Sequence, residues 1–440
     1  MQDWLTMRAA DLGRGIGAGT IGPVALTETY LKAIADHPFA ERIYVLVTAA
    51  RARAEAEAAE ARARAGKRLS LIDGVPISWK DLYDTAGDPT ESGTLLLKGR
   101  VPEEDALVVR NASAAGLVCL GKTHQTEFAF SGLGLNPMTQ SPPNVNDHEA
   151  VSGGSSSGAA ASVAFGLAAA AIGSDTGGSV RIPSVWNDLV GLKTVSGRLS
   201  LDGVVPLCAR FDTVGPLCRS VEDAALLLGA LEQDEVADLE GATLEGKSFA
   251  ILSTSAFDGI ENAPRAAFRN AVERLQAAGA SFSEIDIPEV DEAMTLAPIV
   301  FPYEAYHTWQ AEIDGGDGKM YPPVRKRFLQ GRTILAEAYS EAWERLETLR
   351  RAYVDRTSGF DAVALPSTPI LPPKIADLLA DEDYFTTMNL KALQNTRIGN
   401  LMGLCAVTLP TGVPSTGIIL QGVREEALLP LARAAEDALA

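Results

Sequence analysis

The stretch SDTGGSVRIPS, residues 174–184, combines hydroxyl side chains, two adjacent glycines and one arginine. Such a stretch is found in ordinary turns and also in loops that present one serine to a substrate. A serine hydroxyl is weakly nucleophilic and becomes reactive beside a base. If a serine of this stretch is catalytic, another part of the sequence must therefore supply that base.

Lysine offers a base here where histidine does not. None of the four histidines lies in an HExxH or GxSxG pattern, and His124 is more typical of a polar residue near a helix start than of a catalytic group. Lys80 follows a short apolar run in VPISWKDL, where a strand could carry its side chain into the core. Burial without a carboxylate partner favours the neutral amine. Asp81 would point to the opposite face of a continuing strand.

A third stretch, VSGGSSSGAAAS (151–162), places Ser155 after two glycines and before an expected helix. Backbone N–H groups gather at such a helix start, so a phosphate cradle is the competing interpretation. A P-loop would need a lysine followed by serine or threonine, and this stretch contains no lysine.

Together these stretches resemble the amidase signature family. GVPISWKDLYDTAG (74–87), GGSSSGAAAS (153–162) and SDTGGSVRIPS occur in the order of the family, with Ser155 and Ser179 standing 24 residues apart as its pattern requires. The resemblance is strong over about 70–230 and weaker in ALPSTPILPPKI and NLMGLCAVTLP. LPTGVPSTGIILQG (409–422) is shorter than the family form, which affects the far wall of the expected pocket.

The resemblance implies a catalytic triad and an oxyanion hole. Ser179 matches the nucleophile, Ser155 the serine held on a cis peptide bond, and Lys80 the terminal base. The oxyanion hole is matched by the backbone N–H groups of Thr176, Gly177, Gly178 and Ser179. We expect no cofactor and no metal, because no group of histidine, cysteine and aspartate has metal-ligand spacing.

Substrate contacts are expected in two places. Ala129 and Phe130 match positions that line the acyl pocket in the family. The segment FPYEAYHTWQ (301–310) offers Tyr303 and His307 as further contacts, together with Tyr306 and Trp309, although these aromatic residues fit core packing equally well. Asp175 and Arg181 flank the nucleophile, and we expect them to support the loop rather than react.

Charge and cysteine content limit the possible partners and the compartment. The net charge of −19 argues against nucleic acid or an anionic membrane as the main partner, although a local arginine can still attract an anionic substrate. We expect a small-molecule amide as the partner, and a homodimer is compatible with the sequence. The four cysteines form no CxxC pair and suggest reduced residues in a cytoplasmic protein.

Alternating strand and helix patterns predict an α/β fold, a single large domain with a mixed β-sheet core flanked by helices, which is also the fold of the family. Helices are predicted over 20–36, 49–65, 220–232, 264–279 and most of 288–360, strands over 75–79, 188–193, 202–206, 248–252 and the start of 361–374, and a helix followed by a strand over 106–120. The apolar run GAAASVAFGLAAAAI (158–172) is too short to span a bilayer and predicts a buried helix.

The resemblance also divides the chain. We expect a helical N-terminal arm over 1–68, the amidase signature core over 69–235, a variable helical cap over 236–360 and the C-terminal part of the core over 361–440.

The expected function is hydrolysis of a carboxylic amide to an acid and ammonia or an amine through an acyl-serine intermediate. One alternative is a glutamyl-tRNA amidotransferase A-type subunit that releases ammonia from glutamine, since this subunit shares the three motifs. The other is a catalytically silent binding or scaffold protein, against which the complete set of Lys80, Ser155 and Ser179 argues.

Overall fold

One mixed sheet forms the centre of the protein. The computed structural model describes residues 2–253 and 255–440. The strands in this part of the chain are β1 (Tyr44–Val47), β2 (Pro76–Lys80), β3 (Val118–Thr123), β4 (Ala170–Ser174), β5 (Val190–Lys193), β6 (Val214–Cys218), β7 (Ser248–Leu252), β8 (Ser281–Ile285), β9 (Ala362–Pro366), β10 (Cys405–Pro410) and β11 (Gly417–Gly422). Their order across the sheet is β1-β3-β2-β4-β6-β5-β10-β11-β9-β7-β8.

Both parallel and antiparallel pairs occur in this sheet. Strand β2 runs parallel to both β3 and β4, and β7 runs parallel to both β8 and β9, while the remaining neighbours are antiparallel. Strands β2, β3, β4, β5 and β6 are buried along their whole length, as expected of strands covered on both faces. The predicted α/β domain with a large mixed sheet is confirmed.

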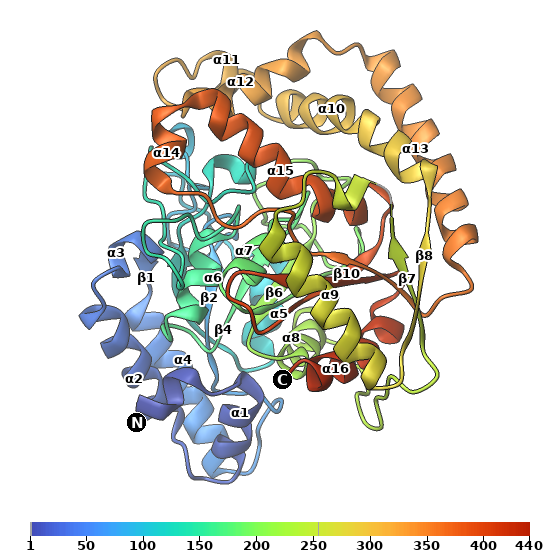
Figure 1. Ribbon diagram of the computed structural model, residues 1–440. Coiled ribbons are helices and arrows are strands. Elements are labelled where there is room, and N and C mark those ends of the chain that lie inside the picture. The colour runs from blue at the N-terminus through green and yellow to red at the C-terminus, as the bar shows by residue number, and fades with distance from the viewer. Residues whose placement is uncertain (1, 254) are drawn as a thin grey trace.

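Helices flank the sheet, and one group of them lies beyond it (Figure 1). The helices are α1 (Ala9–Gly17), α2 (Pro23–Asp36), α3 (Ala40–Ile43), α4 (Ala49–Arg64), α5 (Leu107–Ala114), α6 (Ser157–Ala164), α7 (Arg181–Trp186), α8 (Val221–Glu232), α9 (Asn262–Ala277), α10 (Pro288–Thr308), α11 (Gln310–Asp314), α12 (Pro322–Gln330), α13 (Ala336–Thr357), α14 (Ile375–Ala380), α15 (Glu382–Leu401) and α16 (Glu425–Ala438). Helix α10 packs against α12, α13 and α15, and these helices form the layer at the top of Figure 1.

The N-terminal segment is more than a helical arm. Its helices α2 and α4 match the predicted ranges, and α4 buries Ala52, Ala56 and Ala59 on one side. The short strand β1, which the sequence did not predict, pairs antiparallel with β3 and forms the edge of the sheet. Four residues of partly exposed strand carry too little pattern to be recognised alone.

Two sequence predictions in the core were wrong. The apolar run 158–172 is not one helix, because α6 ends at Ala164, the chain turns at Gly166 with a φ of +72°, and β4 then begins. Glycine adopts this left-handed conformation without strain and commonly ends a helix. The range 202–206 forms no strand, and only an isolated bridge joins Val204 to Tyr83.

The region expected to be a cap has two parts. Residues 248–285 supply β7 and β8 to the main sheet with α9 between them, and the helices α10–α13 follow.

All four cysteines are buried, and none forms a disulfide bond. Within the described residues, no helix combines the length and the apolar character needed to cross a membrane.

Candidate active site

Two parallel neighbours, β2 and β4, bring the site together. Trp79 pairs with Ile172 in their ladder, so the strands end side by side, β2 at Lys80 and β4 at Ser174. Ligands of such sheets bind beyond the carboxyl ends of the strands. The loop that follows β4 carries Ser179 at this edge.

Lys80 is fully buried among hydroxyl groups. Its Nζ lies 2.6 Å from Ser155 Oγ and 2.8 Å from Ser174 Oγ, and it forms no ion pair with any described carboxylate. Burial lowers the Lys80 pKa to about 7, although the charges of Asp175 and Asp212 oppose the shift.

The carboxylate next to Lys80 in the sequence is held elsewhere. Asp81 forms a buried ion pair with Lys122, with 3.1 Å between Lys122 Nζ and Asp81 Oδ1. Asp81 therefore has its own partner, although β2 ends at Lys80 and does not continue through Asp81 as the prediction assumed. No carboxylate of the described residues forms an ion pair with Lys80 Nζ, which favours its neutral form.

Ser155 lies between the lysine and the nucleophile loop. The Gly154–Ser155 peptide bond is cis, as the resemblance predicted, and the side chain is fully buried. The carbonyl of Ser155 accepts a hydrogen bond from the Thr126 N–H at 3.1 Å. The next residue, Ser156, donates its N–H to the carbonyl of Ser179 at 3.3 Å, which joins the two serine loops directly.

Asp175 fixes the shape of the nucleophile loop from inside. It accepts hydrogen bonds from the N–H groups of Gly178 and Val180 at 2.8 and 3.1 Å. Gly178 has a φ of +143°, and a Cβ there would lie 2.1 Å from Thr396 Oγ1 on α15. Only glycine fits this position, because both the backbone conformation and the close approach exclude a side chain.

Of the four backbone N–H groups predicted as oxyanion donors, one already has a partner. The N–H of Gly178 is already engaged by Asp175. The N–H groups of Thr176, Gly177 and Ser179 make no hydrogen bond to any described residue, so these three can stabilise an oxyanion. Thr176 is held through its hydroxyl, which donates to Asp212.

Asp175 and Arg181 form a fully buried ion pair, with 2.8 Å between Arg181 Nη2 and Asp175 Oδ1. Arg181 also donates to the Thr396 carbonyl and to Asn400 Oδ1 on α15. Burial alone would raise the Asp175 pKa, but the charge and hydrogen bonds of Arg181, the charge of Lys193 and the hydrogen bond from Asn400 together outweigh it and hold that pKa well below its usual range. This arrangement supports the loop, as the sequence analysis expected.

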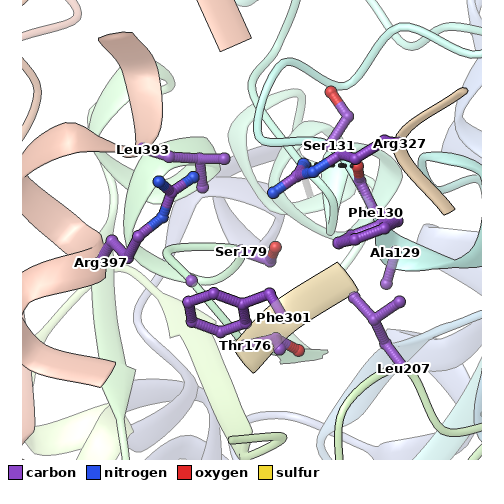
Figure 2. Close-up of a pocket in the computed structure, with 11 residues that line it drawn as sticks. Ala129, Phe130, Ser131, Thr176, Ser179, Leu207, Phe301, Arg327, Leu393 and Arg397 are labelled. Atoms are coloured by element: carbon purple, nitrogen blue, oxygen red, sulfur yellow. Dashed lines mark hydrogen bonds between the residues drawn. The ribbon is translucent and has the colours of Figure 1, made fainter. Parts of the chain in front are cut away.

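A pocket opens beside Ser179, and its empty volume, open solvent included, is about 310 Å³ (Figure 2). Its lining residues are Ala129, Phe130, Ser131, Thr176, Gly177, Ser179, Leu207, Phe301, Arg327, Leu393 and Arg397. Ala129 and Phe130 line this pocket, and their contact with the acyl group of a substrate stays a prediction. The shortened stretch 409–422 contributes no residue to this lining.

Tyr303 and His307 do not line this cavity, contrary to the expectation. Tyr303 stacks on Tyr339 with 4.2 Å between ring centroids, and His307 is exposed. Their helix, α10, turns Phe301 toward the cavity, and residues two and six positions further along project from other sides of a helix with 3.6 residues per turn. Trp309 is a packing residue whose indole N–H donates to the Pro206 carbonyl.

His124 is not placed as a base. It is buried, its pKa is lowered to about 4 by that burial, and its side chain makes no hydrogen bond to Ser155 or Ser179 among the described contacts. Within the same described residues, no cluster of three or more histidine, cysteine or acidic side chains is arranged to hold a metal ion.

Several site residues were missed from the sequence. Ser174 opens the stretch that carries Ser179, and the parallel pairing of β2 with β4 could have placed it beside Lys80. Arg327, Leu393 and Arg397 come from α12 and α15, far along the chain, where no local pattern marks them, and Phe301 begins the aromatic run from which other residues were predicted as contacts.

Comparisons of sequence and of structure with known proteins point to one family over most of the chain. The model of the Amidase family matches residues 25–420. The 2-amino-5-chloromuconic acid deaminase of Comamonas testosteroni is 34% identical over 363 aligned positions, which cover 79% of this chain and 76% of that protein. The A-type subunit of the glutamyl-tRNA(Gln) amidotransferase of Anaeromyxobacter sp. (strain K) is 32% identical over 475 aligned positions, covering 98% and 95%. A solved structure described as "Crystal structure of amidase" superposes with a TM-score of 0.89 at 29% identity, covering 99% of this chain and all of that one.

Proposed function

The chain belongs to the amidase family and is a hydrolase of that family, and from this premise we propose that it cleaves a small carboxylic amide through an acyl-serine intermediate. The observation that carries the proposal is the buried Lys80, whose Nζ lies 2.6 Å from Ser155 Oγ, beside the loop that carries Ser179. A lysine with a pKa of about 7 is about half neutral at pH 7, and its neutral form can accept a proton.

Acylation uses two linked proton transfers. Neutral Lys80 takes the proton of Ser155 while Ser155 takes the proton of Ser179, and Ser179 Oγ forms a bond to the amide carbonyl carbon. The carbonyl oxygen becomes an oxyanion, which the N–H groups of Thr176, Gly177 and Ser179 stabilise. These donors are fixed before the reaction, so they need no reorganisation when the charge develops.

The same groups then complete the cycle. Ser155 gives a proton to the leaving nitrogen and recovers one from protonated Lys80, the C–N bond breaks, and ammonia or an amine departs. Water attacks the acyl carbon, its proton passes back along the same path, and the bond to Ser179 Oγ breaks. The products are a carboxylic acid and the free enzyme with neutral Lys80.

Ammonia release from a panel of small aliphatic, aryl and dicarboxylic amides tests this proposal. Ser179→Ala should abolish turnover, and Ser155→Ala should reduce kcat by about 10²- to 10⁴-fold, because it breaks the proton path. Ser157→Ala is the matched control, since Ser157 Oγ is also buried but bonds only the His124 carbonyl. Turnover by Ser179→Ala within tenfold of the wild type would overturn the assignment.

One second function is favoured by a specific observation. The A-type amidotransferase protein from Anaeromyxobacter aligns with 98% of this chain, against 79% for the deaminase. A role of that kind predicts glutaminase activity and co-purification of a tRNA-binding partner. Neither is expected of an enzyme that hydrolyses small amides alone.

A silent binding protein is the remaining alternative. The arrangement of Lys80, Ser155 and Ser179 argues against it. Burying a lysine without a counter-charge costs free energy, and a binding protein without catalytic activity would gain nothing in return. Failure of Ser179 to react with a fluorophosphonate would favour it.

A further inference from the structure

Two arginines line the cavity beside Ser179. Figure 2 shows the Arg327 and Arg397 side chains reaching into it from α12 and α15. Arg397 is only 8% exposed, and Arg327 is partly buried. Two positively charged side chains therefore line the pocket that contains Ser179, where a substrate would bind.

Neither arginine has a counter-charge in the described part of the chain. Arg327 donates one hydrogen bond from Nη1 to the Phe130 carbonyl at 2.8 Å, and Arg397 makes no side-chain hydrogen bond to any described residue. Asp383, which lies on the wider hollow outside the cavity, is exposed and forms no ion pair with either arginine. By contrast, the nearby Arg181 has Asp175 and two further acceptor groups.

Burying the guanidinium groups of Arg327 and Arg397 without a counter-charge costs free energy when no ligand is bound. Burial lowers the pKa of Arg327 to about 9, with the charge of Arg397 adding to the effect, and burial lowers the pKa of Arg397 to about 10. Both guanidinium groups still carry their charge near pH 7. The rings of Phe130 and Phe301, whose centroids lie 4.1 and 5.8 Å from the Arg327 and Arg397 Cζ atoms, offer a partial offset, but they supply no oxygen acceptors.

The positive charge of Arg327 and Arg397 is a local feature of an otherwise acidic protein. The chain carries a net charge of −19, so two unpaired arginines in a confined cavity do not follow from a general excess of basic residues. Planar guanidinium groups match the two oxygens of a carboxylate, and burial strengthens such a bond. Both arginines line the same pocket as Ser179, so the amide and the carboxylate of one short substrate would lie in that pocket together.

We propose that Arg327 and Arg397 bind a carboxylate of the substrate, so that the enzyme acts on half-amides of short dicarboxylic acids. The inference rests on the proposed function, since the amide carbon must reach Ser179 Oγ while the distant carboxylate meets the arginines. Arg327 and Arg397 act in specificity and positioning, and the proton path through Ser155 and Lys80 is unchanged.

Binding to an inactive protein tests the proposal without relying on turnover. In the Ser179→Ala background, calorimetry would measure the dissociation constants of succinamate, which carries a carboxylate, and of butyramide, which does not. Adding Arg397→Met should weaken succinamate binding roughly 10- to 100-fold and leave butyramide unchanged, because a charge-assisted bond is lost. Arg325→Met is the matched control, since Arg325 is on α12 but pairs with the exposed Asp317.

Turnover supplies the second readout. In the wild type, kcat/KM for succinamate should exceed that for butyramide, and Arg397→Met should remove most of this preference mainly through KM. A neutral fluorophosphonate should still label Ser179 in Arg397→Met, which shows that the fold and the nucleophile are intact. Labelling together with equal use of both amides by the wild type, or an unchanged preference in Arg397→Met, would overturn the carboxylate site alone. Absence of labelling in the wild type would instead overturn the proposed function.

Discussion

Burial turns Lys80 from an ordinary cation into a candidate base. The ammonium would lie in a space with no carboxylate in contact, and the nearest polar groups are the hydroxyls of Ser155 and Ser174. A hydroxyl can share a proton with a neutral amine but cannot neutralise an ammonium charge. The same environment that makes Lys80 useful as a base therefore disfavours its charged form.

Lys80 should leave a signature in stability against pH. Its pKa is about 7 in the folded protein and near 10.5 in a solvated lysine, so the unfolded chain binds more protons between these values. The free energy of unfolding should consequently gain from rising pH across this window, with the full penalty present below about pH 7. Denaturant titrations of the wild type and Lys80→Met from pH 6 to about 10.5 would measure it.

The comparison with Lys80→Met isolates this residue from the others. The difference in unfolding free energy between the two proteins should change with pH, whereas the exposed Lys32→Met control should show a difference that stays constant. A pH-independent difference for Lys80→Met would mean that Lys80 keeps its proton in the folded state.

Ser174 should act as a positioning residue for Lys80. Ser174→Ala removes one of the two hydroxyl acceptors of Nζ, so we expect kcat/KM to fall by roughly 5- to 30-fold, the effect of about 1 to 2 kcal/mol. The acidic limb of the pH profile should also move to lower pH, because the ammonium loses a partner. An activity loss with no movement of that limb would point to a purely structural role, and Ser157→Ala should alter neither quantity.

At the scale of elements, the nucleophile loop is held by helix α15. Thr396 on α15 donates its hydroxyl to the Gly177 carbonyl at 2.7 Å, and Asn400 donates to Asp175 at 2.9 Å. The loop thus has a fixed shape although it lies outside regular secondary structure. Its two adjacent glycines have different tasks, since only Gly178 needs the positive φ.

Replacing Gly177 and Gly178 by alanine, one at a time, should show that only Gly178 is required for the shape of the loop. Gly178→Ala places a Cβ 2.1 Å from Thr396 Oγ1 at a strained φ, so we expect the free energy of unfolding to fall by about 1 to 3 kcal/mol and Ser179 labelling to slow. Gly177→Ala meets nothing nearer than Leu393 Cδ2 at 3.6 Å and should cost less than about 1 kcal/mol. Equal losses for both variants, measured in urea, would contradict this account of the loop.

Elements with strong local patterns could be predicted, and those defined by their partners could not. Helix α4 and strand β7 were predicted within a residue, since their composition and periodicity are distinct. Strand β1 was missed because its pairing with β3, and not its four residues, defines it. The division of 158–172 into α6 and β4 depends on one turn at Gly166. A prediction based only on the run of apolar residues does not detect this turn.

At the scale of the whole molecule, the site combines local motifs with distant segments. Lys80, Ser155 and Ser179 could be proposed from three motifs, and the structure brings their segments together. The substrate side of the cavity could not be predicted, because Arg327 and Arg397 belong to α12 and α15, whose packing against α10 and against each other decides where these side chains lie. In the aromatic run at 301–310 the predicted contacts were wrong, because the helical phase turns Phe301 toward the pocket instead of Tyr303 or His307.

The central claim is that Ser179 is the nucleophile and that neutral Lys80 activates it. The most direct measurement is the rate of fluorophosphonate labelling against pH, with the adduct located by peptide mass spectrometry, in the wild type and in Lys80→Ala. We predict an adduct on Ser179 and a rate that rises with a single ionisation near pH 7. In Lys80→Ala the rate should be about 10²- to 10⁴-fold lower and lack that ionisation. An adduct on another residue, or an equal rate with the same pH profile in Lys80→Ala, would contradict the claim.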